Sequence, residues 1–227
     1  MGSDVHGGFI NNCSTTGLKT PIKTEWGMNR DYTLFAILAG VRNGYGFAGC
    51  YTHEPLVPIA EDRGLPEWLD TGIEEDGCED YSPELYNKWY GSDWASSDEK
   101  ELGEWMGDHS HTHMNLREIV LWEGWNKHLQ RGGVLSKDHY LETIAVGKEP
   151  KCWCGGVGGG NTNVVEEEIF KALIDVGGTG DKVTHVKCNW KEKETLGENY
   201  KWFLDEINRI GEAYGYEDTY LVVGFDS

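Results

Sequence analysis

The first candidate for chemistry is an acid and a histidine near the start of the chain, Asp4 and His6. The residues around them predict a short strand, in which alternate side chains share a face, so these two point the same way and Val5 points to the other. A carboxylate beside an imidazole can bind a metal ion, share a proton or hold a polar ligand. The alternative is a carboxylate that only hydrogen-bonds a structural histidine. Two polar residues on one strand face are costly to bury without purpose, which favours a functional site.

A second candidate is a run of alternating histidines, His109, His111 and His113, just ahead of a predicted helix. In an extended segment the three would share a face. An imidazole there can ligate a metal ion, and a helix N-terminus favours an anion. The alternative is a polar loop in solvent.

Glycine-rich loops carry the predicted anion-binding arginines, Arg42 and Arg63. Glycines let backbone N–H groups approach an anion, and arginine adds a bidentate fork, which suits a phosphate or a carboxylate. The alternative is that these arginines pair with acids of the chain. Arg30 is a separate case: if residues 31–41 are helical, it lies about 18 Å from Arg42 at 1.5 Å per residue, so the two cannot hold one phosphate.

We assign these candidate residues to three roles: catalysis, ligand binding and metal binding. The predicted catalytic residues are Asp4, His6, His109 and Asp226. The predicted ligand-binding residues are Arg42, Asn43, Arg63 and Ser110. If a divalent metal ion is used, its predicted ligands are Asp4, His6, His109 and His111.

The six cysteines show no Cys-x-x-Cys spacing, which predicts free thiols in a reducing cytoplasm. Cys152 and Cys154 are too close in sequence for an ordinary disulfide framework. A zinc site built on them would need two more ligands from elsewhere in the chain.

The net charge of −19 argues against a nucleic-acid polymer as partner, since phosphate backbones are held by basic surfaces. A small anionic ligand remains compatible, because a local arginine pocket works inside an acidic protein. No apolar run approaches the roughly 20 residues that span a bilayer, and no secretory signal is visible, so we expect a cytoplasmic protein with no membrane partner.

The order of predicted elements indicates an α/β or α+β fold in one domain over residues 1–227. We expect a single sheet that includes the N- and C-terminal strands, flanked by helices, and a long acidic insertion or lid at 50–110. The clearest helices are predicted after Asn29-Arg30-Asp31, after the Asn115/Glu118 capping pair, and over 195–212. The apolar run at 220–225 predicts a central strand buried on both faces.

Several motifs, spread from end to end, together resemble a family of uncharacterised proteins encoded by bacteriophages and some bacteria. They are Asp4-Val5-His6, Arg30-Asp31-Tyr32-Thr33-Leu34-Phe35-Ala36, Arg42-Asn43-Gly44-Tyr45-Gly46-Phe47-Ala48-Gly49, Pro58-Ile59 to Arg63-Gly64-Leu65-Pro66, His109-Ser110-His111-Thr112 and Phe225-Asp226-Ser227. Family members open Cys-Asp-Ile-His and close Phe-Asp-Asn, where this chain has Ser3 and Ser227. The resemblance implies a phage origin, which would place the protein in the host cytoplasm, and it makes His109 the first choice among the histidines.

The segment Asp4-Val5-His6-Gly7 also resembles the opening motif of calcineurin-like metallophosphoesterases, which hold two metal ions. Their later motifs, Gly-Asn-His and Gly-His-x-His, have no counterpart here, which argues against membership of that family. A metal site that arose independently stays open.

Three functions therefore compete. The first is a hydrolase that acts on a small phosphorylated, nucleotide-like ligand, with or without a metal ion. The second is a binding protein that sequesters such a ligand without turnover. The third is an acidic protein that interacts with a host partner. An acid–imidazole pair with a separate histidine cluster favours the enzyme.

Overall fold

The computed structural model describes residues 2–22, 24, 30–69, 109–178 and 180–226. The chain forms two compact units: unit 1 is Met1–Val41, Val57–Glu123 and Tyr200–Ser227, and unit 2 is Arg42–Leu56 and Gly124–Asn199. Most of the insertion expected at 50–110 lies outside the described residues. Folding of residues 1–227 as one domain stays a prediction.

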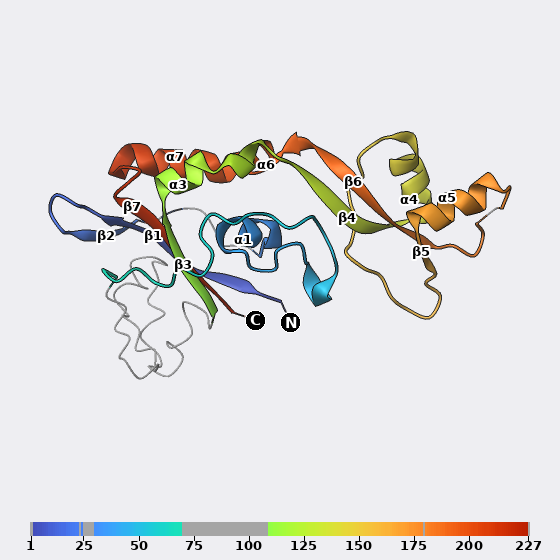
Figure 1. The fold of residues 1–227 in the computed structure, drawn as a ribbon, viewed down its shortest axis with the longest axis horizontal. Helices are drawn as coiled ribbons and strands as arrows, with labels where there is room; N and C mark the ends of the chain where they lie inside the picture. Colours follow the sequence, from blue (N-terminus) through green and yellow to red (C-terminus); the bar gives the residue numbers. More distant parts are fainter. Residues whose placement is uncertain (1, 23, 25–29, 70–108, 179, 227) are drawn as a thin grey trace. The chain divides into compact units, whose positions relative to one another are not determined.

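Unit 1 is built on a four-stranded antiparallel sheet with the order β2-β1-β7-β3 (Figure 1). Its strands are β1 (Asp4–Asn12), β2 (Lys19–Ile22), β3 (His109–Asn115) and β7 (Thr219–Asp226). The prediction that the N- and C-terminal strands share a sheet is confirmed, because β1 pairs directly with β7. The apolar sequence of β7 follows from its place between two strands, with Leu221, Val222 and Val223 fully buried.

The register of β1 on β7 decides which side chains share a face. Asp4 lies opposite Asp226, and Val5 lies opposite Phe225. Directly opposed residues of an antiparallel pair point to the same side. Asp4, His6 and Asp226 therefore share one face of the sheet, and Val5 and Phe225 share the other.

Gly7 allows β1 to approach β7 closely. Its φ of +124° lies in the region that favours glycine, and a Cβ atom added there would lie 2.0 Å from the carbonyl oxygen of Val222. The glycine after His6 is therefore required by the backbone of this sheet.

Helix α1 (Tyr32–Ala39) forms where the sequence predicts it. The carboxylate of Asp31 caps it by accepting a hydrogen bond from a backbone N–H of the first turn, and Gly40, with φ of 73°, ends it. Every residue after the first is buried, which suits a helix that is apolar on all sides. The helix packs on the sheet through Phe35 and Phe225, whose ring centroids are 5.1 Å apart.

Helices α3 (Leu116–Leu121) and α7 (Lys201–Tyr214) lie side by side in unit 1 (Figure 1). The predicted capping box of α3 is present: the Asn115 side chain accepts from the Glu118 N–H, and the Glu118 carboxylate accepts from the Asn115 N–H. The amphipathic α7 buries one face, formed by Phe203, Ile207 and Ile210.

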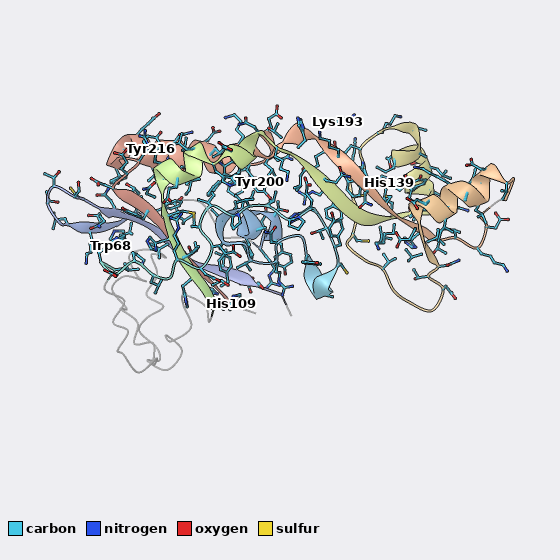
Figure 2. The ribbon with its side chains drawn as sticks, in the orientation of Figure 1. Trp68, His109, His139, Lys193, Tyr200 and Tyr216 are labelled. Atoms are coloured by element: carbon cyan, nitrogen blue, oxygen red, sulfur yellow. The ribbon has the colours of Figure 1, made fainter. Side chains whose placement is uncertain are left out.

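The prediction of one helix over 195–212 is wrong, because the chain leaves helical geometry at Tyr200. Helix α6 (Leu196–Asn199) ends there and α7 begins after it. The Tyr200 hydroxyl donates to the carboxylate of Asp31 at 2.9 and 3.1 Å, which ties the start of α7 to the N-terminus of α1 (Tyr200 is labelled in Figure 2).

Unit 2 contains a second sheet, with the order β4-β6-β5, so the expectation of a single sheet needs correction. Strand β4 (His128–Ser136) is antiparallel to β6 (His185–Thr195), which is parallel to β5 (Val164–Glu166). These strands bury their own core with helices α4 (Lys137–Glu142) and α5 (Glu167–Asp175), formed by Leu135, Tyr140, Phe170, Val183, Val186, Cys188 and Trp190. The sheet forms separately because that core is self-contained. Short 3₁₀ turns are η1 (Phe47–Gly49), η4 (Glu123–Asn126) and η5 (Ile144–Val146).

Within the described ranges, no helix is both long enough and apolar enough to cross a membrane.

Candidate functional site

The predicted residues that the structure brings together are Asp4, His6 and Asp226, on one face where β1 meets β7. The Nε2 atom of His6 lies 3.0 Å from Oδ2 of Asp226. The other oxygen of Asp226 accepts the backbone N–H of Asp4 at 2.9 Å. Asp226 is therefore fixed by the strand pairing itself and in turn fixes the imidazole of His6.

Arg30 completes this group. Its Nε and Nη2 atoms donate to the two carboxylate oxygens of Asp4 at 2.7 and 2.5 Å. The hydrogen bonds from Arg30 hold the pKa of the Asp4 carboxyl below its ordinary value of 3.8, and the guanidinium charge acts in the same direction. We call Asp4, His6, Arg30 and Asp226 the β1–β7 cluster.

The β1–β7 cluster is reachable from solvent. The side chains of Arg30 and Asp4 are 50% and 47% exposed, and those of His6 and Asp226 are 28% and 43% exposed. A cluster with this exposure combines an oriented imidazole, which can transfer a proton, with a guanidinium, which can bind an anion.

The histidines of β3 do not share a face, which corrects the expectation for that run. His109 pairs with Phe225 and stacks on its ring at 6.4 Å, whereas His113 pairs with Val222 (His109 is labelled in Figure 2). The register shifts between His109 and Thr112, and Ser110 has a φ of +53°. This bulge inserts one extra residue and reverses the alternation of faces beyond it.

The register also separates His109 from the β1–β7 cluster. His109 lies on the Phe225 face of the sheet, and its Nδ1 atom is 3.0 Å from the Ser110 hydroxyl. His111 lies within the bulge, where its carbonyl accepts the N–H of Gly64. Asp4 and His6 point to the opposite face, so the structure does not gather the four predicted metal ligands.

The predicted anion-binding residues make contacts within the protein. Arg63 donates to a Glu118 oxygen at 2.7 Å and to the Ile59 carbonyl at 3.2 Å. In unit 2, the Asn43 side chain exchanges two hydrogen bonds with the backbone of Leu56, which is a structural role.

Arg42 also belongs to unit 2, where it donates to the carbonyl of Gly46 at 3.4 Å and has a φ of +51°. Together with Asn43, it shapes the glycine-rich loop. Arg42 and Asn43 thus fall in a different compact unit from Asp4 and His6.

Sequence reasoning missed Arg30 as a member of the site. Its distance from Arg42 along the helix separates these two arginines, but that distance says nothing about Asp4. The sequence feature that could have indicated Arg30 is its positive charge directly ahead of the capped helix, in a chain rich in acidic residues. Its partner follows only from the way α1 packs on the sheet.

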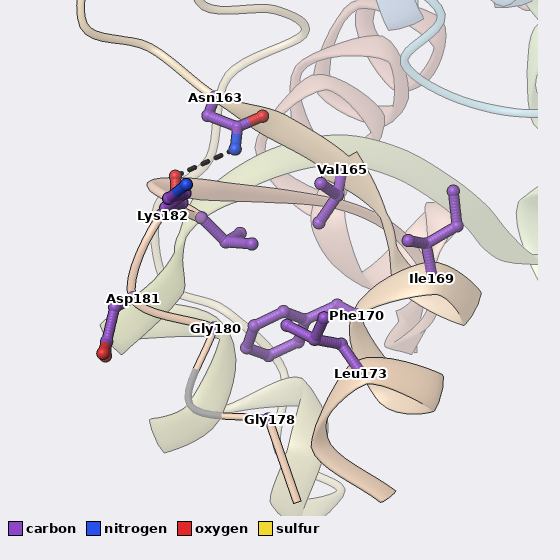
Figure 3. A pocket seen from close by; sticks show the side chains of 10 residues that line it. Asn163, Val165, Ile169, Phe170, Leu173, Gly178, Gly180, Asp181 and Lys182 are labelled. Carbon is purple, nitrogen blue, oxygen red and sulfur yellow. Dashed lines mark hydrogen bonds between the residues drawn. The ribbon is translucent and has the colours of Figure 1, made fainter. Parts of the chain in front are cut away.

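Among the residues that the structure describes, no group of three or more His, Cys, Asp or Glu side chains is gathered closely enough to hold a metal ion. A hollow of about 520 Å³ opens in unit 2 between α5 and residues 178 and 180–183. Figure 3 shows Ile169, Phe170 and Leu173 along it, with the side-chain amide of Asn163 donating to the Lys182 carbonyl at 2.9 Å. Its mostly apolar wall does not suit a phosphate.

No known protein family, curated protein or solved structure matches this chain.

Proposed function

We propose that the protein hydrolyses a small phosphorylated, nucleotide-like ligand at the β1–β7 cluster. The observation that supports this proposal is the oriented pair of His6 and Asp226, with Nε2 and Oδ2 3.0 Å apart. A carboxylate that fixes one ring nitrogen makes the other, Nδ1, the atom that exchanges a proton with water or a leaving group. Histidine is the side chain that most often does this near neutral pH.

Arg30 supplies the anion-binding group in this proposal. Its guanidinium holds a carboxylate, Asp4, in the fork geometry that also fits a phosphate. A phosphate that competes with Asp4 for Arg30 would lie beside the imidazole of His6. The net charge of −19 favours a small ligand over a polyanion, since long-range repulsion grows with the charge of the partner.

A divalent metal ion at Asp4 would compete with Arg30. Both oxygens of that carboxylate accept hydrogen bonds from Arg30, so a metal at Asp4 and His6 would have to share the carboxylate with the guanidinium or displace it. The assay is therefore run with a chelator and again with Mg²⁺ or Mn²⁺.

The experiment is phosphate release from a panel of nucleotides and small phosphodiesters by the purified chain. We expect His6→Asn to lower kcat by about 100-fold or more, because general acid–base catalysis contributes at least that much. The matched control is His128→Asn, a half-buried histidine of unit 2, which should leave kcat unchanged. Equal activity in the His6→Asn variant and the wild type would rule out the proposed role.

The second candidate is a protein that binds the same ligand without turnover. It is favoured by the ion pair of Arg30 with Asp4, which needs only an exchange of partners to bind a phosphate. Native mass spectrometry distinguishes the two: a retained metabolite lost in Arg30→Ala, without phosphate release, indicates a binding protein. A clean mass and no turnover leave the acidic host-interaction protein as the remaining proposal.

A further inference from the structure

A hollow of about 270 Å³ in unit 2 brings together two cysteines and two histidines from three segments of the chain. Its walls include His139, Cys152, Cys154 and His185. They are separated by up to 46 positions in the sequence, so only the fold unites them. Thiolates and imidazoles are the donors that zinc prefers in proteins.

Strand pairing places two of these side chains on one face of the second sheet. Ser136 lies opposite His185 in the β4–β6 ladder, and Cys154 forms an isolated bridge with Val134 on the other edge of β4. Val134 and Ser136 are two positions apart and share a face of β4. Cys154 and His185 therefore point to that same side, and Cys152 reaches the hollow two positions before Cys154.

Trp153 holds this segment in place. Its ring packs edge-on against Trp190 at 5.6 Å, and the guanidinium of Arg131 lies 5.7 Å from its centroid. Trp153 packs against the buried core of unit 2, whereas the cysteines on either side of it are exposed. The thiols are thus presented by an anchored segment.

One of the two histidines lies beside a candidate thiol, and the ring of the other is oriented by a hydrogen bond. The Nε2 atom of His139 lies 3.9 Å from the Cys152 sulfur, and the backbone N–H of His139 is capped by the Ser136 hydroxyl. The Nδ1 atom of His185 lies 3.0 Å from the Thr184 hydroxyl, which makes Nε2 the ring nitrogen available to a metal. A hydrogen bond on the second nitrogen is the usual companion of a metal-binding imidazole.

We propose that His139, Cys152, Cys154 and His185 form a zinc-type site, with two thiolates and two imidazoles as ligands. In this structure the donors are not within bonding distance of one point, and the Cys154 thiol donates instead to the Val134 carbonyl at 3.4 Å. Binding requires the exposed cysteine side chains to turn into the hollow, and it releases the two thiol protons.

The nearby Cys188 belongs to the core and not to this site. It is buried, and burial raises the pKa of its thiol to about 12. The site is independent of the proposed phosphate chemistry, because none of its ligands belongs to the β1–β7 cluster.

The test is titration of the reduced full chain with Co²⁺, which replaces zinc and gives a sulfur-to-cobalt charge-transfer band when thiolates bind it. We expect one Co²⁺ per chain with this band, displaced by Zn²⁺. The double variant Cys152→Ser/Cys154→Ser should lose the band. His139→Ala and His185→Ala should each weaken binding more than about 100-fold, since removal of a ligand costs more than removal of its outer partner.

The matched controls are Cys13→Ser and His128→Ala, which should bind Co²⁺ like the wild type. Circular dichroism checks that each variant is folded, and serine at two exposed positions does not empty the core. The absence of a sulfur band in the wild type, or its survival in the double cysteine variant, overturns the proposal. Loss of Co²⁺ binding in Asp4→Ala/His6→Ala alone would place the metal at the β1–β7 cluster instead.

Discussion

Unit 1 and unit 2 each gather titratable side chains on one face of a sheet, but with different donors. The β1–β7 cluster holds carboxylates, an imidazole and a guanidinium, which suit proton transfer and phosphate binding. The hollow of unit 2 holds thiols and imidazoles, which suit a soft metal ion. The two proposed sites therefore have ligands that should not compete.

The two units also differ in how they use ion pairs. In unit 1 the side chains of Arg30 and Asp4 are about half exposed, whereas in unit 2 those of Arg131 and Glu192 are only 13% and 12% exposed. Exposed pairs add little stability because water and salt screen them, whereas removal of one partner from a buried pair leaves an uncompensated charge. The pair in unit 1 therefore costs little free energy to break, as the proposed exchange for a phosphate requires, whereas the pair in unit 2 is structural.

The largest expected effect on stability comes from Gly7→Ala, which disrupts the strand pairing that positions the β1–β7 cluster. The added Cβ would meet the Val222 carbonyl at 2.0 Å, in a backbone conformation that alanine avoids. We expect a loss of about 3 kcal/mol or more in the free energy of unfolding, measured by urea denaturation. Gly158→Ala is the control, since its Cβ meets nothing within 4 Å. An equal, small loss in both variants would contradict the observed register.

The next effect is that of Arg131→Ala in unit 2. The substitution removes the guanidinium that donates to Glu192, which is largely buried and, among the described residues, keeps the side-chain amide of Asn199 as a hydrogen-bond donor. It also removes the cation that lies over the Trp153 ring. We expect a loss of about 2–3 kcal/mol in the free energy of unfolding, somewhat below the range for fully buried pairs. The double variant Arg131→Met/Glu192→Leu should recover much of it, and a failure to do so would show that the stacking on Trp153 dominates.

The smallest effect is that of Arg30→Ala in unit 1. Because both partners are half exposed, we expect roughly less than half the loss caused by Arg131→Ala, reduced further by salt. A loss as large as that of Arg131→Ala would remove the contrast between the two pairs. The same variant should still weaken binding of a phosphorylated ligand.

The pH dependence sharpens this comparison. Arg30 lowers the pKa of Asp4 in the folded protein, so the pair contributes stability above the ordinary value of 3.8 and loses it as the pH falls through the lowered value. The difference in stability between wild type and Arg30→Ala should therefore be present at about pH 6 and shrink below that ordinary value. Urea midpoints at several pH values measure it, and a difference that grows in acid would contradict the sign.

The features predicted well from the sequence are local ones. The cap of α1 at Asp31, the Asn115/Glu118 box and the buried strand β7 each follow from residues within a few positions of one another. The closeness of Asp4 and His6 follows from strand alternation alone. These features need no knowledge of which strands pair.

Most features that the sequence did not predict depend on contacts between distant segments. The second sheet and the bulge at Ser110 depend on strand register, which cannot be read from periodicity, and the bond from Arg30 to Asp4 depends on how α1 packs on the sheet. The bulge matters most for the site, because one extra residue in β3 places His109 and His113 on opposite faces. The two further ligands of the proposed zinc-type site, His139 and His185, could not be assigned to Cys152 and Cys154 from the sequence, because only the fold brings these residues together.

The pairing of β1 with β7 has a consequence for synthesis on the ribosome. Strand β1 leaves the exit tunnel long before its central partner β7, which is made some 200 residues later. The nascent chain must therefore leave the β7 side of β1 unpaired through most of translation, although β2 can pair with the other side early, and most of unit 2 can fold in the meantime. A truncation before residue 219 should leave β1 and β3 without their shared neighbour and make unit 1, rather than unit 2, the substrate of chaperones and proteases.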